Sequence, residues 1–421
     1  MNKNERELLE SLFRSAVDAV LPERCLAPHL PRAPEGRTVV VGAGKASAAM
    51  AQVVVDHYGE TVSGLVITRY GHGLGTSRIS QIDIVEAGHP IPDDAGNLAA
   101  SRILDLVRGC GRDDLVLCLL SGGGSALLAM PAAGISLDDK QNVTKSLIAS
   151  GATIDEINCV RKHLSAVKGG RLALVAHPTA VVTLAISDVA GDDPSVIASG
   201  PTTADLTTFA DARAILNKFD ITPPRPIARY LDKALNETPT ADDPGLKNTS
   251  LHIVASAKQA LAAAAQSATE RGLEPVVLGD EIQGEAREVA RAHAALARDH
   301  KARGKAVVLL SGGETTVTIQ GSGGGGPNTE YMLGLAIELA GEKDIYAIAC
   351  DSDGIDGSED NAGAMIFPDT LARANTLGLA PQDYLANNDS YSFFAPLRDL
   401  VIPGPTLTNV NDFRAILITP T

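Results

Sequence analysis

Two glycine-rich segments with the same letters, Leu-Leu-Ser-Gly-Gly, follow apolar runs in the two halves of the chain. The first is Leu119–Gly123 and the second is Leu309–Gly313. Each pattern predicts a buried parallel strand that enters a turn, where glycine lets backbone N–H groups close on an anion. The pair predicts two phosphate- or carboxylate-bearing ligands that meet between two domains. The expected anion-binding residues are Ser121, Gly122, Gly123, Ser311, Gly312 and Gly313.

The first segment continues with Gly124 and Ser125. Three consecutive glycines are conformationally costly, and a closely approaching ligand is a reason to keep them. A tight turn is the plain alternative. A nucleophilic serine is a third reading, but the Gly-x-Ser-x-Gly spacing of a nucleophile elbow is absent. We interpret the segment 121–125 as an anion-binding nest.

A third strand–glycine–helix pattern carries a lysine, in Gly42-Ala43-Gly44-Lys45. It matches a dinucleotide fingerprint weakly, because the third glycine is missing and the next strand finishes at Thr68-Arg69 without an acidic residue. The Walker A spacing is also absent. We therefore interpret Lys45, at a helix start beside Gly44, as a residue whose ammonium group can neutralise a phosphoryl group in transfer. A solvated lysine is the alternative.

Cations concentrate in the segment 158–172 of an otherwise acidic protein. On a helix, Arg161 and Lys168 lie within about a turn of Ser165, on a face able to hold a carboxylate or phosphate. Solvated surface charge is the alternative. We expect His163, in the same segment, to be a structural or solvent-facing histidine rather than a catalytic base.

Carboxylates follow several of the predicted strands. Asp188 comes after an apolar run, at the strand end where open α/β sheets bind ligands, and its carboxylate suits the orientation or deprotonation of a hydroxyl group. In the second half, Glu314, Asp353 and Asp356 are candidate Mg²⁺ ligands that act together with ligand phosphates, and Asn328 is a candidate phosphate ligand. Turn formation by the Asp-Gly pairs is the alternative.

These residues require an α/β scaffold, and apolar runs alternate with helical stretches along the chain. We predict a doubly wound parallel sheet in a larger domain, 1–235, and a smaller α/β domain, 236–421, with the junction in the Pro- and Asp-rich segment 220–247. The predicted strands are 38–41, 64–68, 82–86, 115–119 and 180–186, then 251–255, 274–278, 306–310 and 345–350. The predicted helices are 47–57, 95–107 and 139–150, then 257–271, 286–301 and 328–339.

Bulk composition excludes several classes of protein. The net charge of −15 and the aromatic content of 3% disfavour nucleic-acid binding. The five cysteines contain no CxxC pair, which disfavours zinc and a disulfide framework and suits the cytoplasm. The charged, amphipathic start, 1–14, is expected to be a helix and neither a signal peptide nor a membrane span.

Taken together, these motifs resemble the class II glycerate 2-kinases, the MOFRL-containing family whose members are often labelled hydroxypyruvate reductases. The matching stretches are 41–47, 87–90, 120–126, 158–172, 187–189, 199–202, 311–314 and 353–357. The resemblance implies phosphorylation of D-glycerate to 2-phosphoglycerate with ATP and Mg²⁺, in a cleft between a Rossmann-like domain and a MOFRL domain. The essential lysine of the family falls on Lys45.

One position departs from the family pattern. Many members carry Gly-Gly-Arg-Asn where this chain has Gly325-Gly326-Pro327-Asn328. Either another cation, such as Arg161 or Lys168, takes the role of the missing arginine, or the substrate preference differs.

Two rival functions stay open at this point. An NAD(P)H-dependent hydroxypyruvate reductase would use Arg69 for the 2′-phosphate of NADP, but the glycine fingerprint is incomplete and no hydride-transfer acid–base pair is evident. A non-enzymatic binding module is disfavoured by the cations and carboxylates in both halves. The expected partners are glycerate and ATP, with a monomer or homodimer as the assembly.

Overall fold

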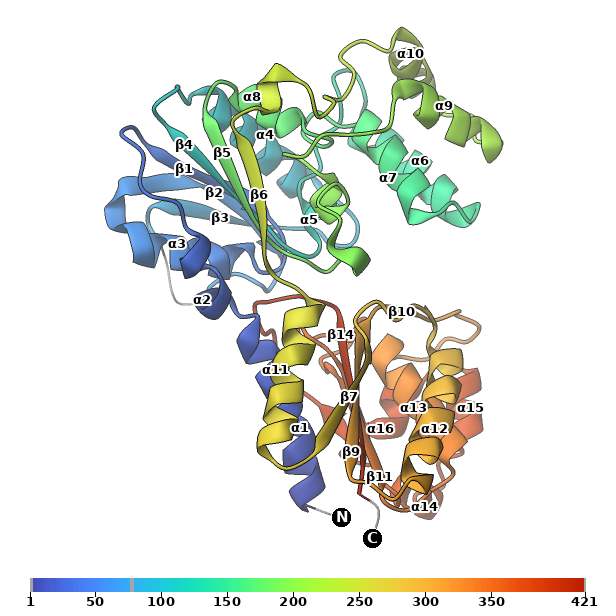
Figure 1. Cartoon of the computed structure of the whole chain (residues 1–421). Helices are drawn as coiled ribbons and strands as arrows, with labels where there is room; N and C mark the ends of the chain where they lie inside the picture. The colour runs from blue at the N-terminus through green and yellow to red at the C-terminus, as the bar shows by residue number, and fades with distance from the viewer. Residues whose placement is uncertain (1–2, 76–78, 420–421) are drawn as a thin grey trace. The chain divides into compact units, whose positions relative to one another are not determined.

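The computed structural model describes residues 3–75 and 79–419, which form two compact units (Figure 1). The N-terminal unit is Cys25–Val254. The C-terminal unit combines the chain up to Arg24 with the chain from Ala255 onward. Each unit has its own six-stranded sheet.

These units differ from the expected domains 1–235 and 236–421 in two respects. Helix α1 (Lys3–Ala19) packs against α11 (Ala257–Glu270) of the C-terminal unit, because its apolar stripe needs a partner there. Strand β6 (Thr249–Ala255) lies beside β5 in the first sheet. The assignment of a strand at 251–255 to the second unit was therefore wrong.

The sheet of the N-terminal unit has the order β3-β2-β1-β4-β5-β6. Every pairing from β3 through β5 is parallel. This order is that of a doubly wound Rossmann-type sheet, so the predicted fold class is confirmed. The strands, besides β6, are β1 (Thr38–Ala43), β2 (Val62–Arg69), β3 (Ile82–Ala87), β4 (Leu115–Leu120) and β5 (Ala180–Ile186).

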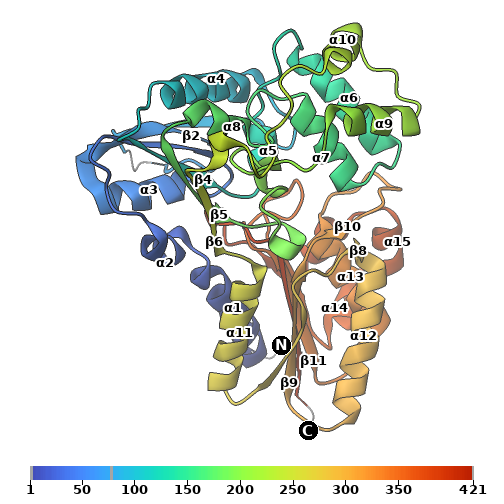
Figure 2. The same cartoon turned by 45° about the horizontal axis from the view of Figure 1, so that its top comes forward.

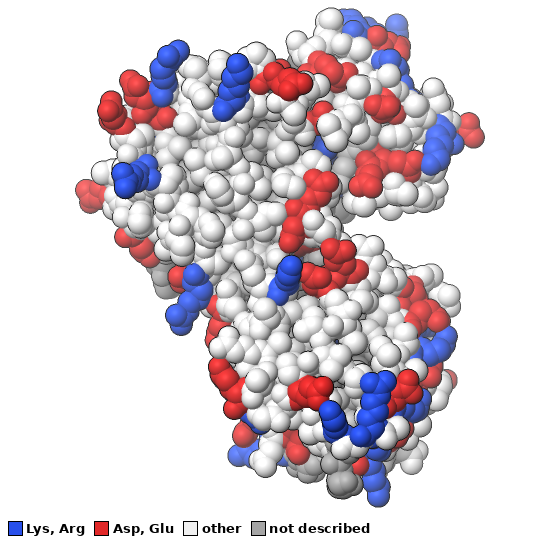
Figure 3. Space-filling model, in the orientation of Figure 1, with Lys and Arg blue, Asp and Glu red and all other residues white. Residues whose placement is uncertain are grey.

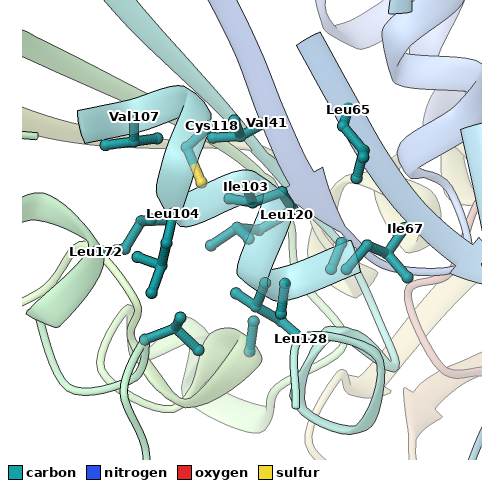
Figure 4. Packing of buried hydrophobic residues seen from close by; sticks show 14 of the residues in the cluster. Val41, Leu65, Ile67, Ile103, Leu104, Val107, Cys118, Leu120, Leu128 and Leu172 are labelled. Carbon is teal, nitrogen blue, oxygen red and sulfur yellow. The ribbon is translucent and has the colours of Figure 1, made fainter. Parts of the chain in front are cut away.

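Helices cover both faces of this sheet, with α3 and α4 on opposite sides (Figures 1 and 2). Beneath α4, aliphatic side chains such as Val41, Leu120 and Leu104 form a core almost without aromatic rings (Figure 4). A separate cluster of helices, α6, α7, α9 and α10, has its own apolar core. The short helix α2 (Pro22–Cys25) contains the boundary residues Arg24 and Cys25. The other helices of this unit are α3 (Ser47–Tyr58), α4 (Asp94–Arg108), α5 (Gly124–Leu127), α6 (Leu137–Ala149), α7 (Ile154–His163), α8 (Arg171–Ala176), α9 (Phe209–Lys218) and α10 (Arg225–Lys233).

The sheet of the C-terminal unit has the order β13-β12-β11-β14-β9-β7 and is mixed. Only β7 and β9 pair in parallel, and the other pairings are antiparallel. Helices α1 and α11 cover one face, and α12 and α13 cover the other (Figure 2). The strands are β7 (Glu274–Gly279), β9 (Val307–Gly313), β11 (Ile345–Asp351), β12 (Gly363–Ile366), β13 (Leu400–Val401) and β14 (Asp412–Ile418), with a separate pair β8 (Gly284–Glu285) and β10 (Thr315–Thr316). The remaining helices are α12 (Ala286–Ala302), α13 (Pro327–Leu339), α14 (Thr370–Thr376), α15 (Pro381–Ala386) and α16 (Ser390–Phe394).

The surface is charged in a mixed pattern. On the face drawn in Figure 3, Lys and Arg side chains are interspersed with Asp and Glu. None of the described helices combines the length and the apolar composition that crossing a bilayer requires. Cys118, Cys159 and Cys350 are buried, and none of the five cysteines, all within the described ranges, forms a disulfide bond.

Candidate active site

The predicted catalytic residues of the N-terminal unit follow strands that end at one level. Ala43 of β1 is paired with Leu120 of β4, which is paired with Ala185 of β5. Adjacent strands lie about 4.8 Å apart, so the three strand ends span roughly 10 Å. Lys45 and Asp188 therefore both leave the sheet at its carboxyl edge, where doubly wound sheets bind ligands.

Hydrogen bonds join the Lys45 loop to the glycine-rich loop after β4. The Lys45 N–H donates to Gly122 O over 2.8 Å, and the Ala46 N–H donates to Ser121 Oγ over 3.0 Å. A Cβ on Gly44 would lie 2.0 Å from that same Ser121 Oγ. Gly44 and Ser121 thus hold the two loops together, and only glycine permits this approach.

The next glycine brings a histidine to the site. Gly123 has φ +80°, and a Cβ there would lie 3.0 Å from His89 Nε2 and 3.6 Å from Lys45 Cγ. A Cβ on Gly124 would lie 2.8 Å from Ala43 O. Gly123 and Gly124 therefore allow His89, Lys45 and β1 to pack closely against this loop. The close approach that the sequence attributes to a ligand is made at least partly by these protein groups.

A pocket of about 270 Å³ opens beside these loops, wholly within the N-terminal unit. One wall is α6, and another is the loop that begins at His89. Gln141 Nε2 of α6 donates to Pro92 O of that loop over 2.7 Å and ties the walls together. The pocket is lined by His89, Pro90, Ile91, Pro92, Gly123, Ser125, Ala126, Ala129, Leu137, Lys140, Gln141, Thr144, Lys145, Ile148 and Arg161.

Three cations, Lys140, Lys145 and Arg161, line this pocket, and its lining contains no carboxylate. Lys140 is 6% exposed, and its Nζ has no hydrogen-bond partner among the described residues. Burial and then the charge of Arg161 lower the pKa of Lys140 to about 7. Burial also lowers the pKa of Arg161. The pKa of Lys168 falls well below its usual value because of burial, Lys140 and Arg161, in that order.

The side-chain amine of Lys168 is hydrogen-bonded to backbone carbonyl oxygens. Its Nζ donates to Ser125 O over 2.8 Å and to Ala198 O over 3.3 Å. Ala198 and Ser199 hold φ values of +51° and +59°, which L-residues rarely adopt, and Lys168 helps to fix them. Ser199 Oγ is hydrogen-bonded to Ser125 Oγ. The position of Lys168 thus fits a positioning residue better than a direct phosphate ligand.

The other members of the cationic segment are structural, except Arg161. Lys162 pairs with Asp205 over 3.3 Å. His163 is hydrogen-bonded through Nδ1 to Cys159 O over 2.8 Å and through Nε2 to Glu237 over 3.0 Å, which confirms its structural role. Arg161, which forms no ion pair among residues 3–75 and 79–419, is the cation of this segment that faces the pocket.

The second Ser-Gly-Gly does not enter a turn. Ser311, Gly312 and Gly313 are the last residues of β9 and pair with Arg414, Phe413 and Asp412 of β14. A Cβ on Gly313 would lie 2.3 Å from the backbone of Ile282. The predicted turn is therefore wrong, because an antiparallel neighbour continues the ladder and a loop packs on the glycine.

The predicted carboxylates of the C-terminal unit do not form a joint site. Asp356 is fully buried and caps α13: its oxygens accept the Asn328 N–H at 2.9 Å, the Thr329 N–H at 2.8 Å, the Thr329 hydroxyl at 2.9 Å and the Asn328 amide at 3.3 Å. These four donors use the acceptor capacity of the carboxylate. Burial raises the pKa of Asp356 to about 6. Asn328 also donates to Asp412 over 2.6 Å, so it is a member of this buried network.

The remaining two predicted carboxylates, Glu314 and Asp353, differ in their exposure to solvent. Glu314 is exposed after β9, whereas Asp353 is buried and accepts the N–H of Ile355 at 2.8 Å. Within the part of the chain that the structure describes, no group of three or more His, Cys, Asp or Glu is arranged to hold a metal. The three predicted Mg²⁺ ligands are therefore not gathered in one such group, and their role at a metal stays a prediction.

Two family models match the chain. The model described as "Domain of unknown function (DUF4147)" matches residues 8–232, and that of the MOFRL family matches residues 307–412. The chain is 38% identical to the D-glycerate 2-kinase of Thermotoga maritima, over 98% of each protein. The crystal structure titled glycerate kinase from that organism covers 99% of this chain with a TM-score of 0.89.

The chain belongs to the class II glycerate kinase family. It is also 50% identical, over 98% of this chain and 94% of the relative, to a protein of Agrobacterium vitis that is named provisionally as a hydroxypyruvate reductase. Both labels named in the sequence resemblance thus occur among its relatives.

For a member of the glycerate kinase family, the departure at Pro327 has a local explanation. Pro327 is the first residue of α13, a position where its fixed φ and missing N–H are tolerated. Asn328 and Thr329, the next two residues, donate to the Asp356 cap. The proline therefore starts the helix without disturbing the buried network.

Sequence reasoning missed two pocket residues of this glycerate kinase family member. Lys140 lies within the predicted helix, at i, i+3 and i+7 spacing with buried Val143 and Leu147, so a lysine in an apolar stripe was the available signal. His89 lies in the matching stretch 87–90, but it is not among the predicted site residues. Asp188 is half-buried in the loop after β5, as its sequence position predicts.

Proposed function

We propose that this chain phosphorylates D-glycerate at its 2-hydroxyl group with ATP. The observation that supports it most is the Lys45 loop, locked to the glycine-rich loop at the carboxyl edge of the sheet beside a pocket of uncompensated cations. Phosphoryl transfer is catalysed mainly by positioning and by charge stabilisation, and this arrangement supplies both. Kinship with proteins named glycerate 2-kinase and glycerate kinase agrees with it.

In the proposed mechanism, Lys45 neutralises the phosphoryl group in transit. Its backbone is held by Gly122, so the side chain starts from a fixed position and little reorganisation is needed. Asp188, on the loop after β5, orients the 2-hydroxyl group and accepts its proton. Arg161 pairs with an anionic group of a ligand, and Lys168 holds Ser125 and Ala198 in place around it.

The C-terminal unit contributes less to this proposal than its sequence suggested. Glu314 and Asp353 stay candidates for contacts to the nucleotide phosphates through a bound ion. We propose Mg²⁺ as the ion that accompanies ATP. Five cysteines that form no disulfide bond within the described residues suit a reducing compartment, and we propose the cytoplasm.

The decisive assay incubates the purified chain with D-glycerate and Mg-ATP, follows ADP, and identifies the phosphoglycerate isomer by NMR. The expected product is 2-phosphoglycerate. Hydroxypyruvate with NADH or NADPH is run in parallel, because a relative carries the reductase name and Arg69 ends β2 in a Rossmann-type sheet. Nicotinamide oxidation without ADP formation would replace the kinase by the reductase.

A further inference from the structure

The pocket of the N-terminal unit has two chemically different ends. At its rim, Ile91 and Ile148 are 60% and 58% exposed, although both are large aliphatic residues. Deeper in the lining, Lys140 is 6% exposed and Arg161 is partly buried. One α6 face carries both chemistries, since Ile148 lies eight residues, or about 12 Å, beyond Lys140 along the helix.

The cations at the deep end of the pocket suit an anionic group of a ligand. The Lys140 amine has no hydrogen-bond partner among the described residues, and a buried polar group without one costs free energy. Arg161 is near enough to oppose the charge of Lys140, and the pocket lining holds no Asp or Glu. A phosphate group placed between the two side chains would pair with both.

The apolar side chains at the rim suit a flat, apolar part of a ligand. Pro90, Ala126 and Leu137 line the same pocket as Ile91 and Ile148. D-Glycerate has three carbons that all bear oxygen, so it offers nothing for these side chains to cover. The side chains of Gln141 and Thr144 supply hydrogen-bonding groups between the two ends.

We propose that this pocket is the binding site of the adenine nucleotide, with the base against Ile91 and Ile148 and the phosphates against Lys140 and Arg161. The inference rests on the proposed use of ATP and adds which residues hold it. The pocket continues to Gly123, whose neighbours are His89 and Lys45, so the phosphate chain leads toward the residue assigned to the transfer step. Lys140 and Ile148 then become the determinants of nucleotide affinity.

The test measures the Kd of ADP by isothermal titration calorimetry on the full chain, without turnover. Lys140→Met removes the charge and keeps an unbranched side chain, and Ile148→Asp places a carboxylate at the exposed rim. The matched controls are Lys233→Met, at the exposed end of α10, and Leu377→Asp, a 54% exposed residue of the C-terminal unit. Each of the two pocket variants is expected to weaken ADP binding about tenfold or more, because a charge-assisted contact or the apolar seat is lost. The controls should change it less than twofold.

Inorganic triphosphate and adenosine, used as competitors of ADP, test the two ends of the pocket separately. Lys140→Met should weaken competition by inorganic triphosphate and spare adenosine, whereas Ile148→Asp should do the reverse. Lys140→Arg should restore most of the affinity for triphosphate. Thermal melts without ligand verify that each variant is folded.

Several outcomes would overturn the assignment. They are unchanged ADP affinity in both pocket variants, a raised KM for D-glycerate with unaltered ADP binding, and binding of NADPH but not ADP. Failure of the proposed function looks different: the wild-type chain would bind ADP in a Lys140-dependent way and still form no ADP from D-glycerate and ATP.

Discussion

The segments Leu119–Gly123 and Leu309–Gly313 have identical sequences and unlike surroundings. In the first, β4 stops at Leu120, and Ser121 and the glycines turn to meet the Lys45 loop. In the second, β9 runs straight through to Gly313. The first segment borders a cation-lined pocket, and the second lies within a sheet.

The neighbouring strands explain the difference. The two strands beside β4 are parallel to it and are paired with it only as far as Leu120. Beyond that level the backbone has no ladder to join, so it is free to turn. The antiparallel neighbour of β9 pairs with it as far as Gly313. A glycine-rich sequence permits a turn, but an adjacent strand decides whether the turn is made.

The largest effect is expected at the first segment's partner, Lys45. Lys45→Ala should lower kcat by roughly 10²–10³-fold, the range seen when one preorganised charge-stabilising group is removed. The measurement is steady-state ADP formation, with Lys233→Ala as the matched control. Unchanged turnover in a folded variant would remove Lys45 from the transfer step.

One glycine-to-alanine substitution in each segment tests whether the first borders a ligand site and the second is structural. Gly313→Ala should lower the free energy of unfolding by roughly 2–4 kcal/mol, because φ is +116° and a Cβ would meet the Ile282 backbone. Gly123→Ala should cost only about 1 kcal/mol in stability, yet at least about tenfold in kcat, since a Cβ presses on His89 and Lys45. Thermal melts and kcat per folded molecule are measured together. The opposite pattern would make the second segment the ligand site.

A third prediction separates helix capping from metal binding. Asp356→Asn should destabilise the chain by about 1–3 kcal/mol, because an amide N–H₂ faces donors of Asn328 or Thr329 that lose their acceptor. Asp353→Asn serves as the comparison, with apparent Mg²⁺ affinity from initial rates as the second readout. If Asp356→Asn shifted only the Mg²⁺ dependence and left stability intact, the carboxylate would be a metal ligand after all.

The smallest effect concerns the stability of the ligand-free chain at different pH values. The pKa of Lys140 is about 7 when folded, below the ordinary value of 10.5, so between these values the unfolded state binds one more proton and stability rises with pH. Arg161 on α7, Lys168 after α7, His89 on the opposite wall and Lys145 on α6 are the charged or titratable groups around it. Lys140→Met should therefore raise Tm by a few degrees below pH 7, with the gain shrinking toward pH 10. A gain independent of pH would show that folding does not shift the pKa of Lys140.

Much of the N-terminal sheet could be predicted because its signal is local. The strand expected over 180–186 matches β5 at both ends, and those at 38–41 and 115–119 end within two residues of β1 and β4. Buried parallel strands read as continuous apolar runs between turn residues. The strand at 251–255 was also found, but its sheet was not, since partner choice depends on contacts that a local pattern does not contain.

The candidate site was predicted in outline and completed by the fold. The location of Lys45 and Asp188 at the carboxyl edge of the sheet could be predicted, because both follow apolar runs and parallel strands share one carboxyl edge, whereas their roles stay predictions. Lys140 was not found. Its chemistry comes from burial beside Arg161, which lies on the next helix along the chain.

The sequence by itself determined the succession of strands and helices, the glycine positions that allow close backbone approach, and the family. These are properties of neighbouring residues and their steric limits. The tertiary structure alone decided which of two identical segments turns, which cations are paired, and that Asp356 caps a helix. Those outcomes depend on desolvation and on partners far away in sequence, such as β14 for β9 and Ser125 and Ala198 for Lys168.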